Sequence, residues 1–222
     1  EFDASPAAKG PNLSLASKVA PSLGIIHSSL VSSKARVTPP TVAAARFNNP
    51  AGIAIHSSGI IYISDRDNHL IRRIDPSGNV STFAGSRTSG SYDAQGTSAS
   101  FNEPSGMAFD SSGNLYVADR SNHKIRKIDL ASGEVSTLAG SGNGATGDGP
   151  AELANFYFPK AITSDGSHIY VVGTSNNIIR KVHIETGFVE TIAGSGSSGS
   201  EDGYLDSASF SQPEGIVSVD AD

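Results

Sequence analysis

The sequence SDRDNHLIRRID, residues Ser64–Asp75, returns as ADRSNHKIRKID at Ala118–Asp129, 54 residues further along the chain. A third version, VGTSNNIIRKVH, begins another 54 residues on, at Val172–His183. A catalytic motif rarely occurs three times at a fixed spacing in one chain, whereas a structural repeat recurs at a fixed spacing by definition. The spacing therefore predicts a repeat architecture, and any function has to be carried by the assembled repeats.

Each repeat unit begins at a phenylalanine that is followed three residues later by a proline. The four starts read FNNPAGIA, FNEPSGMA, FYFPKAIT and FSQPEGIV, from Phe47, Phe101, Phe156 and Phe210. Inside the units, apolar segments of five or six residues, rich in Ile, Val, Tyr and Thr, alternate with Gly-, Ser- and Asn-containing turns. This pattern predicts an all-β fold with four antiparallel strands per unit, which is the blade of a β-propeller.

The composition restricts the function classes. The chain has 222 residues, a net charge of -6, and 16 Lys and Arg against 22 Asp and Glu. Sequence-independent nucleic-acid binding needs a dense basic surface, so this balance disfavours it. The absence of cysteine excludes disulfides, Cys-ligated zinc and thiol nucleophiles. No apolar run approaches the roughly 18 residues that a membrane span needs.

The elements PxGIA, NLYVAD, N-x-x-I-R-K-I and TLAG resemble NHL repeats, and the resemblance covers roughly Phe47–Val219. The Gly/Ser/Asp-rich loops between the units mark the longer variant of this repeat. The resemblance implies a β-propeller, commonly six-bladed. Propellers of this family serve as protein-binding platforms, RNA binders and enzymes, so the resemblance restricts the fold much more than the function.

The unit boundaries predict the domain organisation. Residues 1–46 are expected to form an Ala/Ser/Pro-rich segment, in which residues 24–31 supply an outer strand to a blade completed elsewhere. Residues 47–222 are expected to form an incomplete NHL-type propeller of about three blades and one strand of a fourth. The blade boundaries are 47–100, 101–155, 156–209 and a partial 210–222. Such a chain cannot close a six-bladed ring, so we expect a fragment of a longer protein, half of a dimeric ring, or part of a cleaved chain.

Basic pairs recur on the third segment of each unit and define a candidate interaction surface. Adjacent strand residues point to opposite faces, so one cation of each pair is expected to meet a carboxylate of a neighbouring blade or loop. The second interpretation is a charge ladder that binds an acidic partner. The candidate surface residues are these arginines and the aspartates at the eighth position of the inter-unit loops: Arg72, Arg126, Arg180, Asp93, Asp148 and Asp202.

Two histidines, His69 and His123, occupy equal places in the quoted turns, and Asn177 stands there in the third unit. Histidines in equivalent turns of adjacent blades could approach a metal ion or a substrate. A catalytic zinc usually takes three protein ligands, and this sequence holds no third equivalent histidine. Exposed turn histidines are therefore the favoured interpretation, and a zinc site is the alternative.

The loops between units are a second candidate for metal binding, because they are 15 residues long and contain acidic residues. The loop SGSSGSEDGYLDSAS brings Glu201, Asp202 and Asp206 close together in sequence. Oxygen ligands suit calcium, but the spacing is not that of an EF-hand, and the loop SRTSGSYDAQGTSAS has only one acid. Structural turns are the favoured interpretation and calcium is the alternative, so no cofactor is expected.

These observations predict a non-enzymatic module for protein–protein interaction or scaffolding that is part of a larger protein or assembly, because no catalytic set is assembled in the sequence. The partner is expected to be another protein or the remainder of its own propeller, and a homodimer is an alternative. Two alternatives remain: a propeller enzyme with metal-assisted hydrolase or lyase chemistry in the central channel, and RNA binding. Gly/Ser-rich, acidic loops favour a secreted, periplasmic or organelle-lumen location over the cytoplasm.

Overall fold

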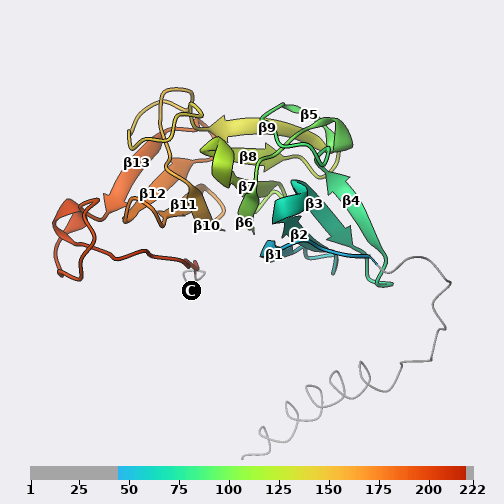
Figure 1. The fold of residues 1–222 in the computed structure, drawn as a ribbon, viewed down its shortest axis with the longest axis horizontal. Helices are drawn as coiled ribbons and strands as arrows, with labels where there is room; N and C mark the ends of the chain where they lie inside the picture. The colour runs from blue at the N-terminus through green and yellow to red at the C-terminus, as the bar shows by residue number, and fades with distance from the viewer. Residues whose placement is uncertain (1–44, 219–222) are drawn as a thin grey trace, which may run out of the picture. The chain divides into compact units, whose positions relative to one another are not determined.

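The computed structural model describes residues 45–218, so the outer strand expected at residues 24–31 lies outside the described part. The described residues form three antiparallel sheets that follow one another along the chain (Figure 1). Four 3₁₀ turns of three residues each are the only helical elements in this range. Among these residues, no helix has the length and apolar character that crossing a membrane requires.

In each sheet four long strands lie side by side in the order of the sequence, as expected for a propeller blade. The first sheet contains β1 (Pro50–Ile55), β2 (Ile61–Asp65), β3 (Leu70–Ile74) and β4 (Val80–Ala84). The second contains β6 (Pro104–Phe109), β7 (Leu115–Asp119), β8 (Lys124–Ile128) and β9 (Glu134–Ala139). The third contains β10 (Pro159–Ser164), β11 (His168–Gly173), β12 (Ile178–His183) and β13 (Val189–Ala193). The prediction of four-stranded antiparallel blades is confirmed.

The short strand β5 (Ala94–Gln95) was not predicted. It lies in the loop between the first two blades and pairs with the outer strand β9, through Ala94 with Val135 and Gln95 with Glu134. The next loop makes a similar antiparallel bridge between Gly149 and Val189. Each of these two loops therefore covers the outer edge of the blade that follows it, which protects an otherwise unpaired strand edge.

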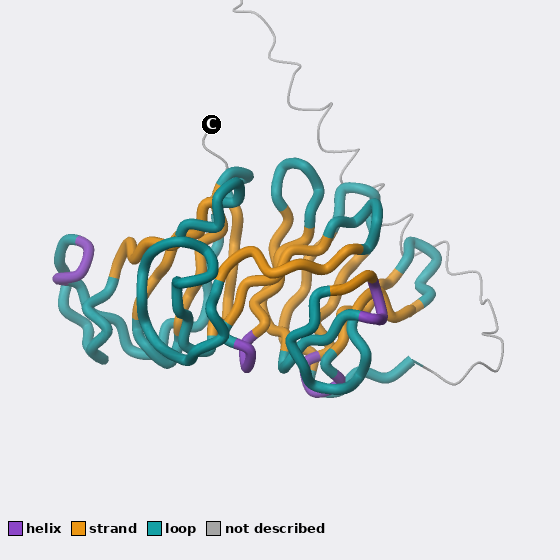
Figure 2. The backbone as a smooth tube through the Cα atoms, turned by 90° about the horizontal axis from the view of Figure 1, so that it is seen from above, coloured by secondary structure: helices purple, strands orange, loops and turns teal. Residues whose placement is uncertain are grey.

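The core consists of two apolar clusters, one between each pair of neighbouring blades. Every residue of β7 is buried, because the middle blade packs against a neighbour on both faces. Tyr62 of the first blade meets Phe109 of the second in an edge-to-face contact, with ring centroids 5.8 Å apart. Figure 2 shows the strands grouped together, with turns and loops at their ends.

The inner strands β1, β6 and β10 approach one another closely, and glycine makes this approach feasible. A Cβ atom on Gly52 would lie 2.2 Å from the carbonyl oxygen of Ser105, and one on Gly106 would lie 2.7 Å from that of Lys160. The Ser64 hydroxyl locks the first contact, since it donates to the Ser105 carbonyl at 2.6 Å. The glycine of the PxG motif therefore serves blade-to-blade packing.

The predicted first strand of a fourth blade, residues 215–220, differs from the structure over its described part. No strand is assigned from 213 to 218, and residues 219–222 lie outside the described range. The segment nevertheless lies beside β10, because the Ser218 N–H donates to the Thr163 hydroxyl at 3.0 Å and the Ser218 hydroxyl donates to the Ser164 carbonyl at 2.6 Å. A regular strand needs a partner ladder, and the described residues provide none for this segment.

Candidate functional site

A buried arginine on the third strand of each blade is the centre of the repeated motif. In the second blade, Arg126 on β8 is fully buried. Its Nη1 donates to Asp119 at 2.7 Å and to the Ser100 carbonyl at 3.0 Å, and its Nη2 pairs with Asp93 of the preceding loop. The guanidinium lies 5.2 Å from the ring centroid of Phe101, within cation–π range. One arginine thus joins its own blade to the loop that enters it.

Asp119 holds the other side of this cluster at the end of β7. It is fully buried, and its carboxylate accepts hydrogen bonds from the Asn102 backbone at 2.7 Å and the Asn122 side chain at 2.8 Å. Burial raises the pKa of the Asp119 carboxyl, while Arg126 and these two donors oppose that rise. The aspartate therefore ties together the turn after β7, strand β8 and the chain that enters β6.

The first blade repeats this arrangement. Arg72 donates to Asp65 at 3.0 Å, and Asp65 accepts from the Asn48 backbone at 2.7 Å. The ring centroid of Phe47 lies 5.4 Å from the Arg72 guanidinium. Because Asp65 is also fully buried, the two aspartates of the quoted motif have the same structural role in successive blades.

The third blade departs from the pattern at Gly173, which replaces the aspartate. A Cβ atom there would lie 1.9 Å from Oδ1 of Asn176, so the amide fills part of the space of the missing side chain. That Oδ1 atom is buried and has no hydrogen-bond partner among the described residues. Arg180 instead binds the carbonyls of Asn155 at 3.0 Å and Gly147 at 2.8 Å, together with Asp148 at 2.6 Å.

The burial of these arginines corrects one expectation from the sequence. Arg126 and Arg180 are 0% and 1% exposed, and Arg72 is 8% exposed. Side chains this deeply buried do not meet a partner that approaches through solvent. The three arginines therefore do not form an exposed interaction surface. The first expectation, pairing with a carboxylate of a neighbouring blade or loop, describes Arg126 with Asp93 and Arg180 with Asp148, whereas Arg72 pairs with Asp65 of its own blade.

The loop aspartates contact both outer strands of the following blade. Asp93 accepts hydrogen bonds from the Thr137 backbone at 3.0 Å and the Thr137 hydroxyl at 3.2 Å, beside its pair with Arg126. Asp148 repeats the arrangement with Thr191, at 3.0 Å for both contacts. The third loop aspartate, Asp202, is exposed and makes no side-chain hydrogen bond within residues 45–218. These carboxylates thus hold blades together wherever a following blade is described.

The turn histidines also accept hydrogen bonds from the neighbouring blade. His69 and His123 adopt the left-handed conformation with φ of 57°. The Nδ1 atom of His69 accepts the backbone N–H of Glu103 at 3.2 Å, and that of His123 accepts the N–H of Phe158 at 3.2 Å. The side chain of Asn177 takes the equivalent contact in the third blade. Acceptance through Nδ1 requires the neutral ring to carry its proton on Nε2.

The environment of His123 favours this neutral form. Burial lowers the pKa of its imidazole, and the nearby Arg120 cation lowers it further. The ring lies edge-to-face with Phe158, with centroids 4.5 Å apart. A protonated ring would lose its acceptor nitrogen and leave the Phe158 N–H without this partner.

The structure does not bring the proposed metal ligands together. Across residues 45–218, no group of three or more His, Asp and Glu side chains has a geometry that could hold a metal ion. His69 and His123 use their Nδ1 atoms in different blade contacts. The carboxylates of the loop aspartates Asp93 and Asp148, which were not among the proposed metal ligands, bind arginine and threonine. The acidic group Glu201, Asp202 and Asp206 remains exposed in its loop.

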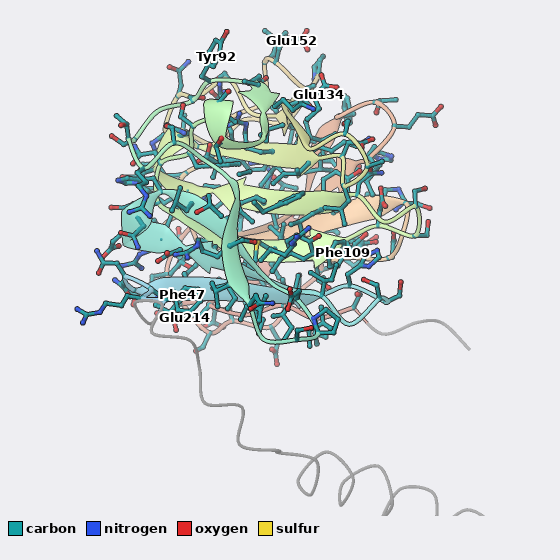
Figure 3. The ribbon with its side chains drawn as sticks, turned by 90° about the vertical axis from the view of Figure 1, so that its right-hand side faces the viewer. Phe47, Tyr92, Phe109, Glu134, Glu152 and Glu214 are labelled. Carbon is teal, nitrogen blue, oxygen red and sulfur yellow. The ribbon has the colours of Figure 1, made fainter. Side chains whose placement is uncertain are left out.

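A groove of about 360 Å³ crosses the inner strands β1, β6 and β10, and it is the feature that sequence reasoning missed. Arg66, Arg120 and Lys160 contribute to its lining, with side chains that are 32%, 30% and 36% exposed. Each cation has a carboxylate beside it: Asp67, Glu103 and Glu214 respectively. Figure 3 shows Glu214 at the opposite end of the view from Glu134 of the outer strand β9. The sequence signal that could have indicated this groove is the Asp-Arg dipeptide that ends the second strand of the first two units, because its arginines, Arg66 and Arg120, line the groove.

Comparison with known proteins identifies the repeat in two segments of this chain. Residues 47–74 and 101–128 match the NHL repeat. The chain is 40% identical over 91 residues to Protein SUPPRESSOR OF QUENCHING 1, chloroplastic, of Arabidopsis thaliana, covering 40% of this chain and 9% of that protein. It is 30% identical over 157 residues to NHL repeat-containing protein 2 of Bos taurus, covering 64% and 22% respectively. The chain therefore spans less than a quarter of the length of either relative.

Solved structures share the same fold. A protein of unknown function from Bacteroides thetaiotaomicron VPI-5482 superposes with a TM-score of 0.55 and 30% identity, covering 64% of this chain and 35% of that one. An auxiliary nutrient binding protein from the same organism superposes with a TM-score of 0.60 and 24% identity, covering 75% and 42%. With the repeated strands and turns, the comparisons show NHL repeats at residues 47–74 and 101–128, and the described part of the chain has the fold of an incomplete β-propeller.

Proposed function

We propose that this chain is a protein-interaction module that binds its partner along the groove across β1, β6 and β10. The observation that carries the proposal is the rim of this groove, where three partly exposed cations stand beside three carboxylates. Charged groups at a rim contribute to orientation and specificity of association. Because each cation has an acidic neighbour, the rim suits a polar protein segment of mixed charge better than a polyanion.

The strands that line the groove supply a second kind of contact. Among residues 45–218, β1, β6 and β10 are edge strands of their sheets, so within this range each has one edge without a hydrogen-bonded strand neighbour. Such edges offer backbone N–H and C=O groups to an extended segment. The same strands are held close together by the packing at Gly52 and Gly106. A surface that is already ordered loses little conformational entropy when a partner binds.

The test begins with a photo-reactive residue introduced at Arg66 or at Arg120, and with one at Lys127 as the control. Lys127 lies on β8 and does not line the groove. A partner that binds in the groove should cross-link from both groove positions and not from the control position. The captured protein would then be purified for affinity measurements against the unmodified chain.

The affinity measurement compares the double variant Arg66→Glu/Arg120→Glu with the single variant Lys127→Glu. Reversal of two rim charges should weaken binding about tenfold or more, mainly through a slower association rate at low salt. The Lys127→Glu variant should bind like the unmodified chain. Equal affinities for the groove variant and the control would remove the groove from the binding surface and would refute the proposal.

A further inference from the structure

We propose that Tyr157 and Phe158, together called the aromatic step, receive an aromatic side chain of the protein segment that binds in the groove. The inference rests on the function proposed above and specifies the chemistry of the partner. Three observations carry it: the pair departs from the repeat, its second residue occupies a strained backbone position, and that residue contacts a cation of the groove.

The aromatic step lies where the other repeat units have polar residues. The unit starts read FNNP, FNEP, FYFP and FSQP, so only the third unit has two aromatic residues between its first phenylalanine and its proline. Contacts that hold blades together recur from unit to unit, as the pairs of Arg126 with Asp93 and of Arg180 with Asp148 do. A feature that a single unit carries therefore points to a role outside the blade architecture.

The backbone makes a large aromatic side chain unfavourable at Phe158. This residue has the left-handed conformation with φ of 48°, and its equivalents Asn49, Glu103 and Gln212 have φ of 53°, 53° and 50°. Asparagine tolerates this conformation, whereas a bulky residue in it is a genuine outlier. Strained residues of this kind concentrate at sites that contact ligands. The ring is therefore expected to make a contact that a polar residue would not provide.

Phe158 connects the aromatic step to the groove. Its ring centroid lies 5.0 Å from the guanidinium of Arg120, within cation–π range. Arg120 lines the groove, and Glu103 binds the same guanidinium at 2.7 Å. A carboxylate of the second blade and a ring of the third blade thus hold this cation together, which places the aromatic step directly beside the groove.

Tyr157 presents an oriented ring to solvent, since its side chain belongs to a residue that is 38% exposed. The ring lies nearly parallel to the imidazole of His123, with an interplanar angle of 7° and centroids 6.1 Å apart. It also meets Phe158 edge-to-face, with centroids 5.0 Å apart. Aromatic pairs in these two arrangements contribute more than the area they bury. The aromatic step is therefore preformed for a third ring supplied by a partner.

The charges beside the aromatic step favour a protein segment over a nucleic acid. Aromatic side chains also stack on nucleobases, but single-strand binders combine them with a positively charged groove. The cations Arg66, Arg120 and Lys160 each have a carboxylate as a neighbour. A phosphate backbone would meet these carboxylates, whereas a neutral aromatic side chain brings no charge to them.

The test uses a displayed library of random linear peptides, selected on the unmodified chain. The variant Tyr157→Asn/Phe158→Asn gives the third unit the residues that the first unit has at Asn48 and Asn49, so a residue that tolerates the left-handed conformation replaces the strained one. The matched control is Tyr204→Asn, which removes an 81% exposed tyrosine that does not line the groove. Thermal unfolding confirms that both variants fold.

The selected peptides should share an aromatic residue. Replacing this residue by leucine should weaken binding to the unmodified chain about two- to tenfold. The same replacement should change little in the binding to Tyr157→Asn/Phe158→Asn, because the aromatic step is then absent, and this double-mutant cycle isolates the contact. The Tyr204→Asn control should distinguish the two peptides as the unmodified chain does.

The charge-reversed variant Arg66→Glu/Arg120→Glu separates this inference from the proposed function. Peptides that lose affinity for this variant but share no aromatic residue would overturn the aromatic step and leave the groove as the binding surface. Equal affinities of Tyr157→Asn/Phe158→Asn and Tyr204→Asn would have the same meaning. Peptides that require the aromatic residue and bind the charge-reversed variant unchanged would instead exclude the groove.

Two further results would overturn the aromatic step as a protein-binding site. One is a library that yields no peptide that binds the unmodified chain. The other is a single-stranded oligonucleotide that binds the unmodified chain and loses this affinity in Tyr157→Asn/Phe158→Asn, since the aromatic step would then stack on nucleobases.

Discussion

Replacing Asp119 with asparagine tests the buried cluster directly. The carboxylate accepts three hydrogen bonds, from the Asn102 backbone, the Asn122 amide and Arg126, all between 2.7 and 2.8 Å. Asparagine keeps the shape of the side chain but replaces one acceptor oxygen with an NH₂ donor. At least one of the three donors then faces another donor, and the buried arginine loses one of its two carboxylates.

The size of the effect follows from the burial of both partners, which are 0% exposed. Removing one partner of a buried pair typically costs ~3–5 kcal/mol, because the other charge is left uncompensated. Arg126 retains Asp93 and the carbonyl of Ser100, so the expected loss of unfolding free energy is near the lower end, about 3 kcal/mol. For a domain of this size, each kcal/mol shifts Tm by ~2–4 °C, which gives a decrease of roughly 6–12 °C.

The assay is thermal and urea unfolding of Asp119→Asn beside Asp67→Asn. Asp67 lies in the equivalent region of the first blade but pairs on the surface with Arg66. Exposed pairs of this kind contribute little, so the control should unfold like the original chain. If Asp119→Asn and Asp67→Asn unfold at the same temperature, the buried cluster does not stabilise the blade in the way argued here.

Three further outcomes are expected. Gly52→Ala should reduce the unfolding free energy by ~1–3 kcal/mol in urea, because the new methyl group meets the Ser105 carbonyl, and a neutral result would contradict the packing argument. The folded-state pKa of His123 is lowered, so the contribution of the neutral ring to stability is complete above pH 6.5 and is lost as pH falls through the lower folded pKa. His123→Asn should therefore flatten the decline in the free energy of unfolding between about pH 7 and pH 5. Phe101→Ala should cost ~3–5 kcal/mol in thermal unfolding, and Phe210→Ala clearly less, because only the first ring is fully buried; equal losses would refute this difference.

The strands were predictable from the sequence because each repeat unit shows the same strand and turn pattern independently. Segments such as NLYVAD and KIRKID combine β-favouring residues with turns at both ends, and they become β7 and β8. The two-residue strand β5 could not be predicted in this way. It exists because a glycine- and serine-rich loop meets the outer edge of the next blade, and that meeting is decided by tertiary packing.

The candidate site was less predictable, for a physical reason. An arginine on a strand usually extends its charged end to water, so sequence alone does not distinguish Arg126 from Lys127 beside it. Its burial depends on Asp93, which lies 33 residues earlier and reaches it only after the loop has folded onto the blade. The groove likewise depends on three inner strands that are distant in sequence.

The third blade separates the essential parts of the inter-blade contact from the dispensable ones. Gly173 removes the buried aspartate, yet Arg180 stays buried, because the loop aspartate and two loop carbonyls still bind it. The contact that persists is therefore the one supplied by the preceding loop. The third blade therefore depends on the preceding loop for the carboxylate that pairs with its buried cation, whereas Arg72 and Arg126 also pair with an aspartate of their own blades.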